Sequence, residues 1–441
     1  MKPIKIKIHQ LGAIRDSEVE ISPVMFFSGE SGLGKSYLAL LCHYFFEVLL
    51  NNTRLTKLFD ESEAYQFDRL RKTVTKERQS LPKLKTKDLE QWLAKDIVEY
   101  MRYMLQVDDV PCDITLNLPQ EINLSFSYQL GDSGLSDKED RYIFIRLPSL
   151  AMQVKDFDII DRESPFAYTT RFYLRKILFG DISALEDVVI LPPSRGAFFT
   201  EDITAKTGLF RRFVVRMEDL DTRKEHEPNI SRSLLRKYEE IIGGRIVRRD
   251  RRYFYETDNL SIPISGTASS VKELAPLSLI ISRSDMAKTA ILFEEPEAHL
   301  HPCMQRKMAD LLSMLISHGT YMQITTHSDY ILRRLNELIM LGQLKEQYRM
   351  EDKEEQFEHK CAELRISPTL ALDASGISAY YLEKKNDGTS RVERQSLENG
   401  RLSYKSFFRA IEEELRLTSL LEDMVSPPEE TSVGSEADCQ N

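Results

Sequence analysis

The sequence is poor in cysteine and has no long apolar run. Its 441 residues include five cysteines, an odd number, and none of them forms a C-x-x-C pair. This excludes a disulfide framework and a cysteine zinc site, and it suits a reducing cytosol. No stretch approaches the roughly 20 apolar residues of a membrane helix, and no apolar run of signal-peptide length follows the charged N-terminus. We therefore expect a cytoplasmic protein that has no contact with a membrane.

The sequence also lacks an excess of basic residues. It has 60 Lys and Arg against 70 Asp and Glu, which gives a net charge of −10 at pH 7. A chain of this charge is not a general nucleic-acid binder, but a local basic patch can still bind one. Residues 245–256 carry five arginines, which suit either a solvated strand face or such a patch.

The chain does contain a glycine-rich loop between a strand pattern and a helix pattern. Residues 29–36 read GESGLGKS, which is Gly, four residues, then Gly-Lys-Ser. Alternation at 4–9 and 17–22 and the apolar run at 24–27 predict strands, and 38–50 predicts a buried helix. A buried strand, a glycine turn and a helix are the context in which such a loop cradles phosphate. A chance glycine-rich turn is the alternative.

Each part of this loop has an expected role in binding ATP. The backbone N–H groups would cradle phosphate oxygens at the helix start, and Gly32 and Gly34 permit the close approach. Lys35 would reach the β- and γ-phosphates, and the Ser36 hydroxyl would bind Mg²⁺. The residues predicted to contact the nucleotide are Gly29, Glu30, Ser31, Gly32, Leu33, Gly34, Lys35, Ser36 and Tyr37.

Two adjacent carboxylates follow a second buried strand, in the segment ILFEEPE at 291–297. An apolar strand that ends in two carboxylates places them at the open edge of the sheet, beside the loop. We predict that Glu294 holds Mg²⁺ through water and that Glu295 orients or deprotonates the attacking water. A solvated acidic turn is the alternative, which the following Pro296 and Glu297 disfavour.

Two further groups have positions that fit this site. His327 ends the next strand, in ITTHS, where an imidazole can contact the γ-phosphate and report its loss. Ser269 and Ser270 open a helix-like segment just before the carboxylate strand, where hydroxyls and N–H groups suit an anion. The alternatives are a structural histidine and an ordinary helix N-cap.

The organisation of the chain follows from these segments. Strand and helix patterns alternate after residue 288, which predicts a parallel sheet and an α/β fold. Residues 378–397 predict a hairpin around Asn-Asp-Gly. We expect an ATPase core at 1–50 and 187–425, an insertion at 51–186 with a helix at 87–106 and strands at 121–130 and 141–148, and a disordered tail at 426–441.

The loop, the segment EEPEAHLHP and the segment TTHSDYIL, in this order, resemble the ABC-type ATPases of the RecF, OLD and SMC group. The resemblance covers roughly 1–50 and 187–420 and leaves the insertion unmatched. It implies an ABC-type P-loop ATPase fold with a mixed or parallel sheet core. The short insertion and the hairpin ending are similar to stand-alone antiphage ATPases, such as the ATPase subunits of PARIS and Septu.

The resemblance implies that Ser269 and Ser270 are signature serines, which act on ATP held by the facing subunit. It therefore implies a homodimer, or a multiple of dimers, that sandwiches two ATP molecules. The sequence departs from the family pattern in three places. The serines are not followed by Gly-Gln, Glu294 stands where Asp is common, and PPSRG at 192–196 replaces a glutamine loop, with Arg195 as a candidate there. These departures bear on the rate of hydrolysis more than on ATP binding.

Three functions fit these observations. The first is an ATP-switched sensor that responds to a trigger such as a phage protein and controls a separate effector, a nuclease, in bacterial antiphage defence. The chain itself offers no nuclease cluster after His327, because ALDASG supplies only Asp373. The second is a RecF-like ATPase that binds DNA in repair, which the arginines at 245–252 favour. The third is a scaffold in which ATP only joins the subunits.

Overall fold

A computed structural model describes residues 3–50, 54–119, 123–131, 142–147, 150–155, 164–179, 185–199, 208–224, 229–249, 252–397, 402 and 405–425. Its contacts divide the chain into two compact units, Met1–Ser403 and Tyr404–Asn441. The predicted disordered tail at 426–441 lies outside the described residues. Within the described part of the chain, no helix combines the length and the apolar character needed to cross a bilayer.

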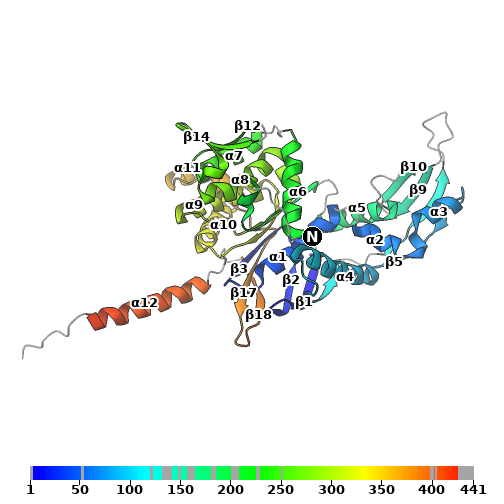
Figure 1. Cartoon of the computed structure of the whole chain (residues 1–441), viewed down its shortest axis with the longest axis horizontal. Helices are drawn as coiled ribbons and strands as arrows, with labels where there is room; N and C mark the ends of the chain where they lie inside the picture. Colours follow the sequence, from blue (N-terminus) through cyan, green and yellow to red (C-terminus); the bar gives the residue numbers. More distant parts are fainter. Residues whose placement is uncertain are drawn as a thin grey trace, which may run out of the picture. The chain divides into compact units, whose positions relative to one another are not determined.

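The first unit is built on a nine-stranded sheet with the order β11-β15-β16-β3-β17-β18-β2-β1-β6 (Figure 1). The five strands from β11 to β17 run parallel, and β17 pairs antiparallel with β18. β18 meets β2 in parallel at one pair, Ser390 with Ile14, and β2, β1 and β6 are antiparallel. The expected α/β fold with a mixed sheet is confirmed.

The strands of the described residues have the following bounds: β1 Lys5–Leu11, β2 Ile14–Glu20, β3 Val24–Gly29, β4 Gln79–Ser80, β5 Leu84–Lys85, β6 Cys112–Asn117, β7 Asn123–Leu124, β8 Ser127–Gly131, β9 Tyr142–Leu147, β10 Leu150–Lys155, β11 Asp187–Leu191, β12 Arg245–Arg249, β13 Arg252–Thr257, β14 Leu260–Pro263, β15 Thr289–Glu294, β16 Tyr321–Thr325, β17 Ile377–Lys384 and β18 Ser390–Gln395.

The helices are α1 Lys35–Leu50, α2 Arg54–Asp60, α3 Phe67–Thr73, α4 Thr86–Leu105, α5 Pro165–Phe179, α6 Gly208–Thr222, α7 Asn229–Ile242, α8 Ser269–Arg283, α9 Pro302–Ser317, α10 Asp329–Met350, α11 Glu354–Glu363 and α12 Lys405–Val425. Short 3-10 turns lie at η1 Glu63–Tyr65, η3 Arg195–Phe199, η4 Ile264–Gly266, η5 Met286–Lys288 and η6 Pro368–Leu370.

The centre of the parallel region is buried on both faces. Every residue of β3, β15 and β16 is buried, as expected for central parallel strands, which read as continuous apolar runs. The apolar helix α1 lies against β3, β11, β15 and β16. The core therefore holds the strands that carry the predicted motifs at fixed positions.

The elements expected after residue 288 are present. The strand β15, the helix α9 and the strand β16 form a βαβ unit, and α9 begins at Pro302, a residue that suits the first position of a helix. The helix α10 is capped by Ser328, whose hydroxyl accepts a hydrogen bond from the Ile331 N–H at 3.1 Å. The predicted hairpin at 378–397 is formed by β17 and β18.

The segment 51–186 contains α2 to α5 and a four-stranded sheet of the order β10-β9-β8-β4. The helix predicted at 87–106 is α4, and the strand predicted at 121–130 is divided into β7 and β8. This segment also supplies β6, which pairs with β1 at the edge of the nine-stranded sheet. The segment is thus hydrogen-bonded to the core sheet through its own strand.

A buried polar cluster ties this segment to α1. Asp96 of α4 accepts hydrogen bonds from the Tyr44 hydroxyl at 2.7 Å and from Arg54 at 2.6 Å. The Arg54 guanidinium also lies 5.7 Å from the centre of the Tyr44 ring and 5.1 Å from that of Tyr100. The cluster joins α1, α2 and α4, and its buried charges are compensated by hydrogen bonds, which a buried ion pair needs in order to stabilise a fold.

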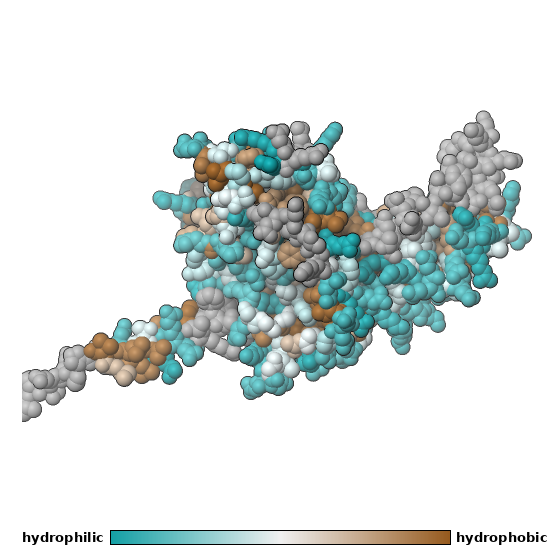
Figure 2. Space-filling view, in the orientation of Figure 1, coloured by the Kyte–Doolittle hydropathy of each residue, from teal (hydrophilic) through white to brown (hydrophobic). Residues whose placement is uncertain are grey.

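The second unit consists, in its described part, of α12. Large apolar side chains along its second half are exposed, and Figure 2 shows the resulting apolar surface on this helix. They are Leu415, Leu417, Leu420, Leu421, Met424 and Val425.

Candidate functional site

Three parallel strands bring the predicted motifs to one edge of the sheet. β15 pairs with β16 and β16 pairs with β3, in a register that places Glu294 beside Thr325 and Thr325 beside Phe27. The chain continues from their carboxyl ends into Glu295, into His327 and into the glycine loop. Ligands in open α/β sheets bind at this edge. The sheet order therefore assembles one site from segments almost 300 residues apart along the chain.

The glycine loop has the backbone geometry that a phosphate cradle needs. Gly29, Gly32 and Gly34 all have positive φ values, of 131°, 78° and 97°. A Cβ at Gly29 would lie 2.5 Å from the Leu382 carbonyl oxygen, so the loop also needs a glycine to pass β17. The helix α1 begins directly after the loop, at Lys35, and presents its first N–H groups there.

Lys35 is a buried cation that forms no ion pair with any of the residues that the structure describes. Its ammonium donates hydrogen bonds to the carbonyls of Glu30 at 2.6 Å and Gly29 at 3.0 Å, and the residue is only 5% exposed. Burial lowers the Lys35 pKa to about 8, and the carboxylates of Glu295 and Glu297 partly oppose this shift. Neutral carbonyls compensate a buried charge poorly, so the loop fits an anionic ligand such as a nucleotide phosphate.

Ser36 and Glu294 meet across the site. The Ser36 hydroxyl donates a hydrogen bond to the Glu294 carboxylate, which is buried at 4% exposure. Burial raises the Glu294 pKa above its ordinary value, and the Ser36 hydrogen bond opposes that shift. A hydroxyl and a carboxylate in contact are oxygen donors of the kind that Mg²⁺ prefers.

Glu295 and His327 form a second pair, closer to solvent. Glu295 Oε1 lies 3.6 Å from His327 Nε2, and the Glu295 side chain is 43% exposed. The His327 ring also donates a hydrogen bond to the Gly29 backbone carbonyl. Burial, followed by the charge of Lys35, lowers the His327 pKa. The imidazole is therefore neutral at pH 7, and the Glu295 carboxylate remains accessible to water.

Glu297 is a member of the site whose role the sequence did not predict. Its Oε1 accepts hydrogen bonds from the Thr326 hydroxyl at 2.9 Å and from the His327 backbone N–H at 2.5 Å. Burial raises the Glu297 pKa. The only signal in the sequence is a third carboxylate two residues after the pair. Glu297 holds the turn that carries His327 in place.

Ser269 and Ser270 lie on a different element, at the first turn of α8. Ser269 is exposed, Ser270 is half-buried, and the preceding Ala268 provides no side-chain cap. Among the described residues, no hydrogen bond joins either serine to the glycine loop or to the two carboxylates. The structure thus brings together the loop, Glu294, Glu295 and His327, while the two serines lie at the start of a separate helix.

Arg195 is fully buried and does not take the place of a phosphate ligand. Its guanidinium donates to main-chain carbonyls, including that of Glu294 at 2.9 Å and that of Glu273 at 2.8 Å. Burial lowers the Arg195 pKa to about 10, so the side chain remains protonated at neutral pH. Through Arg195, the 192–196 loop is therefore hydrogen-bonded to the end of the strand that carries Glu294.

The arginine-rich segment 245–256 forms a hairpin of β12 and β13. Arg245 and Arg249 both pair with the buried Glu256, and Arg248 pairs with Asp221 at 2.7 Å. These pairings neutralise much of the positive charge and favour the interpretation as a solvated strand face.

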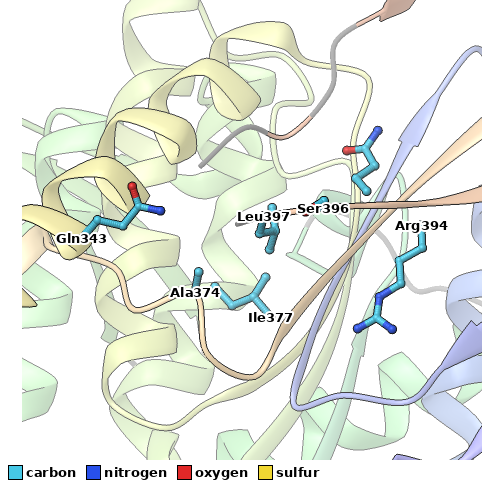
Figure 3. A pocket seen from close by; sticks show the side chains of 7 residues that line it. Gln343, Ala374, Ile377, Arg394, Ser396 and Leu397 are labelled. Carbon is cyan, nitrogen blue, oxygen red and sulfur yellow. The ribbon is translucent and has the colours of Figure 1, made fainter. Parts of the chain in front are cut away.

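A cavity of about 630 Å³ lies away from this chemistry. Figure 3 shows lining side chains from α10 (Gln343), from the loop before β17 (Ala374), from the start of β17 (Ile377) and from β18 (Arg394). None of these residues belongs to the glycine loop, to the carboxylate segment at 291–297 or to the segment that carries His327, so the cavity is separate from the candidate nucleotide site.

Comparisons with known proteins are consistent with this site. The family described as "AAA ATPase domain" matches residues 153–332, less than half of the chain but including the carboxylate strand and His327. No curated protein sequence matches the chain.

Similar solved structures include SMC head domains. An SMC head bound to the C-winged helix domain of ScpA is 13% identical with a TM-score of 0.36 and covers 90% of this chain and 98% of its own. The SMC head domain from Thermotoga maritima is 11% identical with a TM-score of 0.33 and covers 90% and 100%. An SMC head with an extended coiled coil, bound to the C-terminal domain of ScpA derived from Pyrococcus furiosus, is 11% identical with a TM-score of 0.34 and covers 94% and 99%. Likenesses of this size add nothing to what the sheet order and the glycine loop establish.

The lowered Lys35 pKa predicts how ATP affinity depends on pH. Only the charged ammonium attracts phosphate, and it loses its proton as the pH rises through about 8. ATP should therefore bind about tenfold more weakly at pH 9 than at pH 7, because one group of this pKa changes its charged fraction by that factor. Equilibrium titration with a fluorescent ATP analogue measures this. Lys35→Gln should bind weakly with a flat profile, and an equally steep profile in that variant would contradict the assignment.

The chain thus has a mixed α/β fold in which residues 153–332 match an AAA ATPase domain, and its candidate nucleotide-binding site lies at the carboxyl ends of β3, β15 and β16.

Proposed function

We propose that this chain is a Mg²⁺-dependent ATP hydrolase that acts as a switch. The observation that carries the proposal is the convergence of Lys35, Ser36, Glu294, Glu295 and His327 at one sheet edge. Ser36 and Glu294 would hold Mg²⁺, which neutralises phosphate charge when bound. The glycine loop, from Gly29 to Tyr37, would hold the phosphates of the nucleotide.

The residues of this chain suggest how hydrolysis proceeds. Lys35 would exchange the carbonyls of Gly29 and Glu30 for phosphate oxygens, which gives its buried charge an anionic partner. Glu295, which is open to water, would accept a proton from the attacking water. The neutral His327 would hold Glu295 and the γ-phosphate in one hydrogen-bonded arrangement, and its position would change when that phosphate leaves.

We propose that two chains form the complete site. Ser269 and Ser270 stand at the start of a 15-residue helix, with hydroxyl and N–H groups that suit an anion. They lie apart from the glycine loop of their own chain, which fits contact with ATP held by a second copy. A dimer, or a multiple of dimers, would then assemble when ATP binds and separate after hydrolysis.

We propose further that the switch controls a separate effector, a nuclease, in antiphage defence. The site described above is an ATP site, and the ALDASG segment supplies one carboxylate where a nuclease needs a cluster. The surfaces available for a partner are the 51–186 insertion, the hairpin at 378–397 and α12. The six exposed apolar side chains of α12 support a contact with another protein.

The alternative is a RecF-like ATPase that binds DNA. The observation in its favour is the exposed Arg252, which lies opposite the exposed Arg249 across β12 and β13, a placement that a phosphate between them would stabilise. The carboxylates of Glu256 and Asp221 weigh against it. A steep dependence of DNA affinity on salt concentration would favour this alternative over the sensor.

Glu295→Gln should separate ATP binding from hydrolysis. The amide keeps the shape of the side chain but cannot accept the proton, so turnover should fall by about 100-fold or more. ATP should still bind, and the closed dimer should accumulate, which light scattering and retained radiolabelled nucleotide measure. Glu355→Gln, on the exposed face of α11, is the matched control and should behave as wild type. Equal turnover in the wild type and Glu295→Gln would exclude Glu295 as the base.

Ser270→Arg should block assembly and leave ATP binding by the single chain intact. The added side chain would fill the space at the start of α8 and repel a facing Lys35. Nucleotide binding and oligomeric state are measured in parallel, with Ser282→Arg, near the other end of the same helix, as control. Mixing Ser270→Arg with Lys35→Ala chains should restore at most one composite site per dimer. Loss of ATP binding by Ser270→Arg alone would place this serine in the site of its own chain.

The effector proposal predicts an inert single chain and an active complex. The purified protein should hydrolyse ATP slowly and leave DNA and RNA intact, because its carboxylates serve the ATP site. Co-expressed with the product of the neighbouring gene, it should be recovered as a larger complex of defined stoichiometry. Metal-dependent cleavage of nucleic acid by the single chain, lost on mutation of its own carboxylates, would contradict the proposal.

A further inference from the structure

Arg195 is the most deeply buried cation next to the ATP site. It is 1% exposed, and its guanidinium lies 4.9 Å from the centre of the Phe293 ring. No carboxylate oxygen lies closer to it than Glu273 Oε2, at 4.0 Å from Nε, in the described part of the chain. A buried charge is costly, and apolar side chains of similar volume often replace one without loss of stability. We therefore attribute the presence of Arg195 to the elements that it holds in position, and not to a contribution to the free energy of folding.

The Arg195 guanidinium donates hydrogen bonds to main-chain carbonyls of two elements, the turn after β15 and the helix α8. Nη1 donates to the Glu294 carbonyl at 2.9 Å and Nη2 to the Glu295 carbonyl at 3.3 Å. On the other side, Nε donates to the Glu273 carbonyl of α8 at 2.8 Å. Nη1 also reaches the carbonyl of Pro192, in its own loop, at 3.1 Å. One side chain thus joins the carboxylate turn to the helix that carries the two serines.

The turn after β15 has a strained backbone at Glu295, the residue proposed as the base. Glu295 has a φ of 45°, in the left-handed region that non-glycine residues seldom adopt. Its N–H donates to the Thr325 carbonyl at 3.0 Å, and its carbonyl accepts from Arg195. A strained backbone persists only where its surroundings fix it on both sides. Arg195 supplies one of these two restraints on Glu295.

The loop also approaches α8 too closely for any side chain at Gly196. A Cβ there would lie 2.9 Å from the Lys272 carbonyl carbon and 3.0 Å from the Glu273 N atom. These residues are within one turn of Ser269 and Ser270 on α8. The loop and the start of α8 are therefore in direct backbone contact, and a shift of one requires a shift of the other.

We propose that Arg195 is a positioning residue that couples the serine-bearing end of α8 to the backbone of Glu295. When the serines engage a nucleotide, the displacement of α8 would pass through the guanidinium to the Glu295 turn and set the carboxylate toward the water. This inference rests on the proposed hydrolysis at Glu295 and adds the route by which dimer closure reaches the base.

The test compares Arg195→Lys and Arg195→Met with Arg216→Lys. Arg216 is a suitable control because burial also lowers its pKa to about 10, while it pairs with Asp187 and Asp219, away from the site. ATP turnover is divided by the amount of ATP bound in the same sample, so that partial unfolding does not count as lost catalysis. Hydrogen exchange of 269–276 and 293–297 is followed without nucleotide.

Arg195→Lys should bind ATP as the wild type does and turn it over about tenfold more slowly per bound molecule, because one ammonium cannot reach all four carbonyls that the guanidinium reaches. Arg195→Met should lose more, and lysine should thus restore part of the rate. Exchange should rise in both segments together in the Arg195 variants and in neither segment in Arg216→Lys.

Unchanged turnover per bound ATP in Arg195→Met, or exchange that rises in one segment only, would overturn the coupling. Absence of turnover in the wild type would overturn the proposed hydrolysis instead. In that case the exchange data still decide whether Arg195 joins the two segments, so the two failures are distinguishable.

Discussion

The parallel pairing of β15, β16 and β3 is the constraint on which the rest of the site depends. Burial on both faces makes all three strands continuous apolar runs, and their register sets Glu294 beside Thr325 and Thr325 beside Phe27. A slip of one residue would exchange the faces of a strand and separate the two carboxylates from the glycine loop. The packed core thus sets the positions of the candidate site residues, and the loops that follow the strands complete the site.

The sequence was sufficient to place Lys35, Glu294, Glu295 and His327 at one edge of the sheet, because each follows an apolar run that predicts a buried strand. It could not assign roles to Arg195 or Glu297. The partners of Arg195 are main-chain carbonyls 78 and 100 residues away, and one partner of Glu297 is a main-chain N–H. Every residue has the same main-chain carbonyl, so a sequence motif cannot show which carbonyl a buried arginine will bind. Only the fold reveals which polar side chain restrains which turn.

The insertion was predicted as a separate block, and its contacts with the core were not. The strand β6 joins the core sheet beside β1, and Asp96 of α4 accepts a hydrogen bond from the Tyr44 hydroxyl of α1 at 2.7 Å. Such pairings between distant segments leave no periodic signal in either one. They matter because α1 begins directly after the glycine loop, so a partner bound to the insertion would act on the helix that follows this loop.

The charges around the site explain why metal and nucleotide should bind together. Lys35 faces the carboxylates of Glu295 and Glu297, and Glu294 lies beside them. Burial raises the pKa of Glu294 and of Glu297, and repulsion by the neighbouring Glu295 carboxylate adds to both shifts. An ATP anion alone would meet that repulsion with one lysine to offset it. A divalent cation held by Ser36 and Glu294 would reverse the local balance, so affinity for either component should depend on the other.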